Sequence, residues 1–179
     1  MIKKFLVIIC LLLLGSGTYS ASLLIPMDNS QKDHLKAYGI AYWVLERGVE
    51  VKWLLNYMGG SFMIPQVQEI ENECLIRGVS YDIIADAKAN AIVEEISSPS
   101  QNMDVILMQK APKIAVYSPP NKQPWDDAVT LVLSYAEIPY DIIYDEQILD
   151  GKLSDYDWLH LHHEDFTGQF GKFFRNYQH

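Results

Sequence analysis

Residues 113–144 read KIAVYSPPNKQPWDDAVTLVLSYAEIPYDIIY, which contains a strand, a loop, a helix and a second strand. The apolar run from Lys113 to Ser118 predicts a buried strand, and Trp125 to Glu137 has the apolar spacing of a helix. Pro124 suits the start of that helix, because a proline there removes no hydrogen bond. Tyr140 to Tyr144 predicts the next strand. A strand–helix–strand unit with short connections predicts parallel strands joined by a right-handed crossover.

The same alternation of strand and helix runs through the rest of the chain. The other expected strands are Ser22–Met27, Val49–Leu55, Val79–Ala85 and a last strand that follows Tyr156 and carries the histidines, and the other expected helices are Leu35–Leu45, Gln66–Arg77 and Ala87–Ile96. Residues 97–112 form an irregular stretch. The pattern predicts one α/β domain over residues 21–179, with a doubly wound, mostly parallel sheet of about six strands and helices on both faces. We expect this sheet to be incomplete at its carboxyl end.

The first twenty residues have the composition of a secretory signal peptide. Lys3 and Lys4 precede an apolar run from Phe5 to Leu14, and small residues lead to a cleavage position near Ser20 or Ala21. The run is short for a membrane-spanning helix. The sequence therefore predicts an exported protein of the periplasm or the extracellular space, without a stable membrane anchor.

Charge and cysteine content narrow the classes of partner. The chain has a net charge of −9 and no basic cluster, so we do not expect nucleic acid as a partner. Signal-peptide cleavage would remove Cys10 and leave Cys74 without a disulfide partner. Cys74 lies among acidic residues of an expected helix, and neighbouring carboxylates raise the pKa of a thiol. We expect it to be an inert buried thiol.

The densest group of titratable side chains follows the last expected strand, in the sequence DWLHLHHEDFTG at residues 157–168. Open α/β sheets bind ligands at the carboxyl ends of their strands. Side chains just beyond this strand are therefore the main candidates for lining a pocket or transferring protons. They are His162, His163, Glu164 and Asp165.

Two other loops are expected at the same edge of the sheet. Asp28 and Asn29 end the first strand, and Asn121 and Lys122 follow the strand at 113–118. We predict that these four residues bind substrate. Because Asp and Asn also cap helices, local capping is the alternative interpretation.

A divalent metal is a weaker hypothesis for the histidine-rich segment. His160 and His162 share one face of a strand, and Asp165 could complete a metal site. The alternative is a hydrogen-bonded core histidine at 160 followed by a solvated loop. No other cofactor is expected, because the chain has neither of the glycine-rich nucleotide-binding motifs nor a Gly-x-Ser-x-Gly elbow.

Four stretches resemble a family of exported Bacteroidetes proteins commonly labelled asparagine synthetase B. They are residues 25–28 (IPMD), 34–43 (HLKAYGIAYW), 123–128 (QPWDDA) and 156–168 (YDWLHLHHEDFTG). The resemblance implies a flavodoxin-like fold similar to the class I glutamine amidotransferases. It also implies that the protein continues beyond His179, with a cysteine nucleophile in that continuation. The chain lacks the Ser-Gly-Gly-x-Asp-Ser loop of glutamine-dependent asparagine synthetases, so synthetase activity itself is not expected.

These observations lead to three functional hypotheses. The first is an exported glutamine amidotransferase-like protein, the front part of an amidase or hydrolase that is inactive as this chain alone. The second is a non-catalytic module of the cell envelope that binds a small molecule. The third is a metal-dependent hydrolase that uses the His-x-His-His-Glu-Asp segment.

Overall fold

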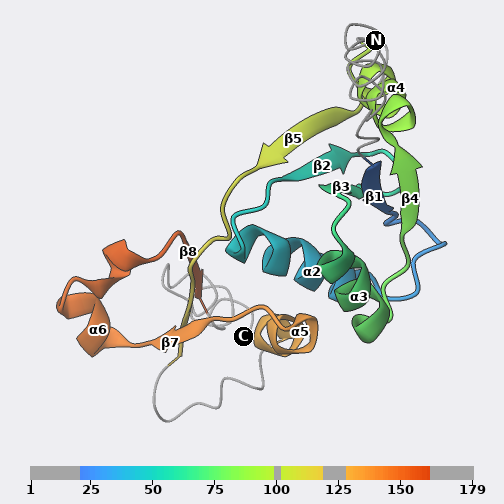
Figure 1. The fold of residues 1–179 in the computed structure, drawn as a ribbon. Coiled ribbons are helices and arrows are strands. Elements are labelled where there is room, and N and C mark those ends of the chain that lie inside the picture. The colour runs from blue at the N-terminus through green and yellow to red at the C-terminus, as the bar shows by residue number, and fades with distance from the viewer. Residues whose placement is uncertain (1–20, 99–101, 119–127, 162–179) are drawn as a thin grey trace, which may run out of the picture. The chain divides into compact units, whose positions relative to one another are not determined.

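The computed structural model describes residues 21–98, 102–118 and 128–161, and it divides the chain into two compact units (Figure 1). The first unit comprises Met1–Lys32 and Val49–Met108, and the second comprises Asp33–Gly48 and Gln109–His179. The chain therefore passes from one unit to the other three times. Neither unit is a continuous stretch of sequence.

The first unit is built on an antiparallel sheet of five strands. The strand order is β4-β1-β3-β2-β5, and every neighbouring pair is antiparallel. The strands are β1 (Ala21–Ile25), β2 (Val51–Leu55), β3 (Phe62–Pro65), β4 (Asp82–Ala85) and β5 (Asp104–Met108). The prediction of a single, mostly parallel, doubly wound sheet of six strands was therefore wrong.

A tight turn between β2 and β3 is one physical reason for this correction. Met58 and Gly59 in this turn both have positive φ values, of 45° and 78°, which reverse the chain within a few residues. The sequence pattern did not indicate β3 or β5, and β5 falls in the stretch expected to be irregular. A hairpin joins neighbouring antiparallel strands, whereas parallel neighbours need a longer crossover.

One face of this sheet is covered by helix α4 (Asp86–Ile96). Leu24 and Met63 face each other across β1 and β3 and lie on that face. The buried cluster consists of Leu24, Leu54, Met63, Ala89, Ile92 and Ile96. Each fully buried aliphatic side chain stabilises a fold by about 1.5–3 kcal/mol, so this cluster is a main source of the unit's stability.

Helix α3 (Gln68–Arg77) follows the expected local rules. Glu69 and Glu71 lie in its first turn, where they meet the positive end of the helix dipole. Gly78 ends the helix with a φ of 72°, a conformation that glycine adopts without a steric penalty. The expected helix is confirmed, with its first residue at Gln68 rather than at Gln66.

The second unit contains a parallel sheet of three strands in the order β7-β6-β8. Its elements are β6 (Ile114–Tyr117), α5 (Ala128–Ala136), β7 (Asp141–Ile143), α6 (Asp145–Leu149), a 3-10 turn (Lys152–Asp155) and β8 (Trp158–Leu161). The parallel strand–helix–strand arrangement that the sequence predicted for residues 113–144 is confirmed. On one face, Ile114 and Val116 pack with Leu133 of α5, and Tyr42 of α2 (His34–Glu46) lies against this cluster.

Polar contacts join α2 to α5 within this unit. Asp33 caps α2 by accepting a hydrogen bond from the backbone N–H of Lys36 at 3.0 Å, and it also accepts one from the Tyr135 hydroxyl. Lys36 Nζ lies 2.6 Å from Glu137 Oε1. Burial opposes the ionisation of Asp33. The hydrogen bonds from the Lys36 N–H and the Tyr135 hydroxyl outweigh this effect and hold the pKa of Asp33 below its usual value. The contacts explain why residues between β1 and β2 belong to the second unit.

We expect Gly59→Ala to destabilise the protein far more than Gly78→Ala. Both glycines have a similar positive φ, of 78° and 72°, so each alanine adds backbone strain of about 1 kcal/mol. Only at Gly59 would the new Cβ also overlap the carbonyl oxygen of Met27, because no atom lies within 4 Å at Gly78. Urea unfolding should show a loss on the order of 3 kcal/mol for Gly59→Ala. Equal losses would mean that the turn shifts to accept the methyl group.

Candidate functional site

The carboxyl edge of the parallel sheet is where the topology places a ligand site. Strand β6 lies in the centre, with β7 on one side and β8 on the other. β6 is followed in the chain by the strand on one side of it, β7, and β7 by the strand on the other side, β8, so the direction of strand addition reverses here. In open parallel sheets, the carboxyl ends of the strands at such a switch point form a crevice that binds ligands.

Ser118 lies at this edge, directly after β6. Its backbone N–H donates to the carbonyl oxygen of Ile143 at 3.0 Å, which continues the hydrogen bonding between β6 and β7. The side chain is buried, with 4% exposure, and within the described part of the chain its Oγ has no hydrogen-bond partner. A buried hydroxyl without a partner costs about 1–3 kcal/mol. The Ser118 hydroxyl can therefore donate and accept hydrogen bonds, and no described residue forms either bond with it.

A tyrosine and a carboxylate flank Ser118 at the same edge. The hydroxyl of Tyr117 donates to Asp145 Oδ1 at 2.8 Å, and the rings of Tyr117 and Tyr144 are 5.6 Å apart between centroids. Tyr117 ends β6, and Asp145 begins α6 directly after β7. The hydrogen bond therefore holds the ends of two neighbouring strands together next to Ser118.

His160 brings an imidazole to the same side of the sheet. It pairs in register with Val116 of β6. Side chains two residues apart along a strand share a face, so Ser118 and His160 lie on the face that α5 covers. The expected last strand is confirmed, at Trp158–Leu161.

The other expected site residues are not brought together by the described part of the structure. Asp28 and Asn29 belong to the unit of the antiparallel sheet, whereas β6 and β8 belong to the other unit. Asp28 Oδ1 accepts hydrogen bonds from the backbone N–H of Ser30 at 2.9 Å and from its hydroxyl at 2.5 Å. These bonds stabilise a local turn, and the cap of the following helix is Asp33 rather than Asp28. His162, His163, Glu164, Asp165, Asn121 and Lys122 lie outside the described residues.

The metal hypothesis stays a prediction. Of its three candidate ligands, only His160 is among the described residues. Within residues 21–98, 102–118 and 128–161, no three side chains of His, Cys, Asp or Glu come together as a metal-binding group.

Cys74 is not available as a nucleophile in the described structure. It is fully buried on α3, as the sequence predicted. Burial, followed by the neighbouring carboxylate of Glu73, raises the pKa of the thiol to about 12. Because the thiolate is the reactive form, this thiol is inert near neutral pH.

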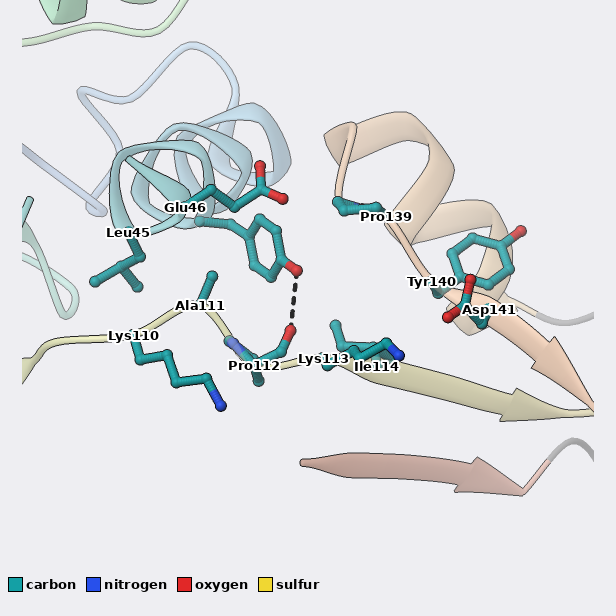
Figure 2. A pocket seen from close by; sticks show the side chains of 11 residues that line it. Leu45, Glu46, Lys110, Ala111, Pro112, Lys113, Ile114, Pro139, Tyr140 and Asp141 are labelled. Atoms are coloured by element: carbon teal, nitrogen blue, oxygen red, sulfur yellow. Dashed lines mark hydrogen bonds between the residues drawn. The ribbon is translucent and has the colours of Figure 1, made fainter. Parts of the chain in front are cut away.

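A cavity of about 430 Å³ opens at the other edge of the parallel sheet, by the amino ends of β6 and β7. Figure 2 shows Leu45 and Glu46 of α2 on one side and Pro139 and Asp141 on another, with the segment 110–114 along a third. The hydroxyl of Tyr42 donates to the carbonyl oxygen of Pro112 at 2.9 Å, which is the dashed line in the figure. Sequence reasoning missed this cavity, because its walls are distant in sequence.

Asp157 bonds to two residues that line this cavity, Lys110 and Lys113. Its backbone N–H donates to the carbonyl oxygen of Lys113 at 2.9 Å, and its Oδ2 accepts from the Lys113 N–H at 2.8 Å. The ammonium group of Lys110 lies 3.0 Å from the same Oδ2. The Lys113 N–H and then Lys110 lower the pKa of Asp157, which stays ionised at neutral pH.

Comparisons with protein-family models, with curated proteins and with solved structures found no match. The resemblance to the family labelled asparagine synthetase B therefore stays a prediction. In the described ranges, no helix has both the length and the apolar character needed to cross a membrane.

We expect Cys74 to resist a thiol-reactive dye at about pH 8 in the folded protein and to react fully in urea. Burial favours the neutral thiol. The buried thiol therefore stabilises the folded state fully at pH values below about 8.5, the pKa of a cysteine in the unfolded chain. This effect is lost as the pH rises toward the folded pKa of about 12. A Cys10→Ala background makes Cys74 the thiol that is measured. Fast labelling of the folded protein would contradict the prediction.

Proposed function

We propose that this protein is an exported α/β protein that binds a small polar molecule at the carboxyl edge of the sheet β7-β6-β8. The observation that carries the proposal is the buried hydroxyl of Ser118, which has no partner among the described residues. A polar group withdrawn from water and left unsatisfied destabilises a fold, unless a ligand supplies the missing hydrogen bond. Its place at a topological switch point agrees with where such sheets bind ligands.

The neighbouring groups favour a ligand that both donates and accepts hydrogen bonds. The Ser118 hydroxyl can do either, and His160 on the same face can also do either in its neutral form. A carboxamide has one carbonyl acceptor and two N–H donors, so it suits this combination. The resemblance to amidotransferase-like proteins leads to the same chemistry, and L-glutamine and L-asparagine are the first probes.

Hydrolysis of such an amide, by an amidotransferase-like protein, is the second candidate function. The observation that favours it is the placement of His160 and Ser118 on one face of the sheet, because a histidine beside a hydroxyl or thiol can act as a general base. Cys74 is too deeply buried to be the nucleophile. Binding without turnover is therefore the better-supported function of the described residues.

Ser118→Ala should stabilise the protein in the absence of ligand. The substitution removes an unsatisfied buried hydroxyl, so the free energy of unfolding should rise by about 1 kcal/mol in urea titrations. Ser154→Ala is the matched control, since its exposed hydroxyl donates to the Gly151 carbonyl oxygen at 3.0 Å. We expect that control to change stability by about 0.5 kcal/mol or less. Destabilisation by Ser118→Ala would show that the hydroxyl already has a partner.

The same variants test binding. L-Glutamine or L-asparagine should raise the melting temperature of the wild type and of Ser154→Ala, because a ligand of the folded state stabilises it by mass action. The rise should be lost in Ser118→Ala. If neither amino acid produces a shift that depends on Ser118, the carboxamide proposal is wrong.

Ammonia release from L-glutamine separates the two candidate functions. Binding alone predicts no release by the wild-type chain under conditions where the melting temperature rises. Turnover that is lost in His160→Ala, while the thermal shift is retained, would instead support the hydrolase. The comparison is informative because removing a general base impairs chemistry more than ligand binding.

A further inference from the structure

The cavity at the amino ends of β6 and β7 has two aromatic walls that are held in place. The Tyr42 hydroxyl is tied to the Pro112 carbonyl oxygen at 2.9 Å. The Tyr140 hydroxyl lies 3.2 Å from Ser134 Oγ, within hydrogen-bonding distance. Pro112 and Pro139 add rigid apolar surface. Because the tyrosine hydroxyls are engaged, the faces and edges of the rings are what a ligand meets.

The lysines of this cavity already have partners. Lys110 Nζ lies 3.1 Å and 3.0 Å from the two carboxylate oxygens of Asp157. Lys113 Nζ lies 4.6 Å from the centroid of the Tyr156 ring, which is the range of a cation–π contact. Asp157 therefore compensates the charge of Lys110, whereas the contact with the neutral Tyr156 ring leaves the charge of Lys113 in place.

The carboxylate of Glu46 is in a different situation. It follows Tyr42 by four residues on α2, so the two side chains lie on the same face of the helix. Glu46 forms no ion pair or hydrogen bond with any side chain of the described ranges. The second carboxylate, Asp141, accepts the Tyr156 hydroxyl at 3.1 Å, and this neutral group leaves its charge in place. Among the described residues of the lining, Glu46 and Asp141 together outweigh Lys113, so the cavity presents negative charge beside aromatic rings.

The ionisation of Tyr42 agrees with this picture. Burial raises the pKa of its hydroxyl first, and the charges of Glu46 and Asp157 raise it further. The same negative potential would favour a bound cation. The net charge of −9 on the whole chain acts in the same direction.

We infer that this cavity is a second binding site, separate from the carboxyl edge, for an organic cation that carries an aromatic or other apolar group. The cationic group meets the Glu46 carboxylate and the ring of Tyr42, and the apolar part lies against Pro112, Pro139 and Tyr140. A volume of about 430 Å³ is in the range of small-molecule sites.

Three probes of similar size and different charge test the inference on the full chain. They are phenethylamine, phenylethanol and phenylacetate, which share one aromatic ring. In calorimetric titrations, phenethylamine should bind about tenfold more tightly than phenylethanol, since an ion pair and a cation–π contact act together. Phenylacetate should bind most weakly.

Two charge-neutralising variants test whether Glu46 causes the preference for the cationic probe. Glu46→Gln should reduce the affinity for phenethylamine to that for phenylethanol. Glu94→Gln makes the same change of charge at an exposed position on α4 and should leave the affinity for phenethylamine unchanged. Ser118→Ala should also leave it unchanged, which separates this site from the carboxyl edge. Equal affinities for all three probes, tightest binding of phenylacetate, or equal losses in the two glutamine variants would each overturn the inference.

Discussion

The burial of β6 is the constraint on which the second unit depends. All four of its residues are buried, and it forms hydrogen bonds with β7 on one side and β8 on the other. A parallel strand covered on both faces must be apolar throughout, which Ile-Ala-Val-Tyr satisfies. Both proposed sites are positioned by this strand. Its carboxyl end leads to Ser118, and its amino end opens onto the cavity beside Tyr42.

Asp157 fixes β8 to this central strand. Parallel strands have no tight turn to set their register, so other contacts must do so. The two hydrogen bonds between Asp157 and the backbone of Lys113 align the start of β8 with the start of β6. The same carboxylate compensates the charge of Lys110, so that this lysine does not offset the carboxylates of Glu46 and Asp141 in the cavity wall. One side chain therefore affects both the register of the sheet and the charge of the cavity.

The two sites illustrate different reasons for polar groups in a fold. Ser118 is withdrawn from water and has no partner among the described residues, so we expect it to cost stability unless a ligand is bound. Glu46 is exposed to solvent and costs little by itself, so its effect is on the choice of ligand. A ligand at the carboxyl edge would consequently raise the stability of the fold by satisfying Ser118. At the amino edge, the charge of the ligand would mainly decide how tightly it binds. Residues that weaken a fold in this way are typical of functional sites.

The sequence by itself determined the local elements with strong patterns. The strand–helix–strand unit of residues 113–144, the helix that ends at Gly78 and the strand that carries His160 were all predicted, because apolar spacing and glycine caps are local signals. The carboxyl edge was also predicted as the place of a site. Ser118 was not singled out, because a serine after a strand has many roles. Only the surrounding structure shows that its hydroxyl is buried and has no partner among the described residues.

Only the tertiary structure decided how the strands pair and which segments share a unit. Apolar spacing indicates that a strand is buried, but it does not specify the neighbour or the direction of pairing. The pattern therefore failed for β3 and β5, which make the first sheet antiparallel. It could not bring Tyr42 to Pro112 either, because their hydrogen bond joins residues 70 positions apart in the chain. Such contacts form only when distant segments pack together, which is why the cavity was found in the structure and not in the sequence.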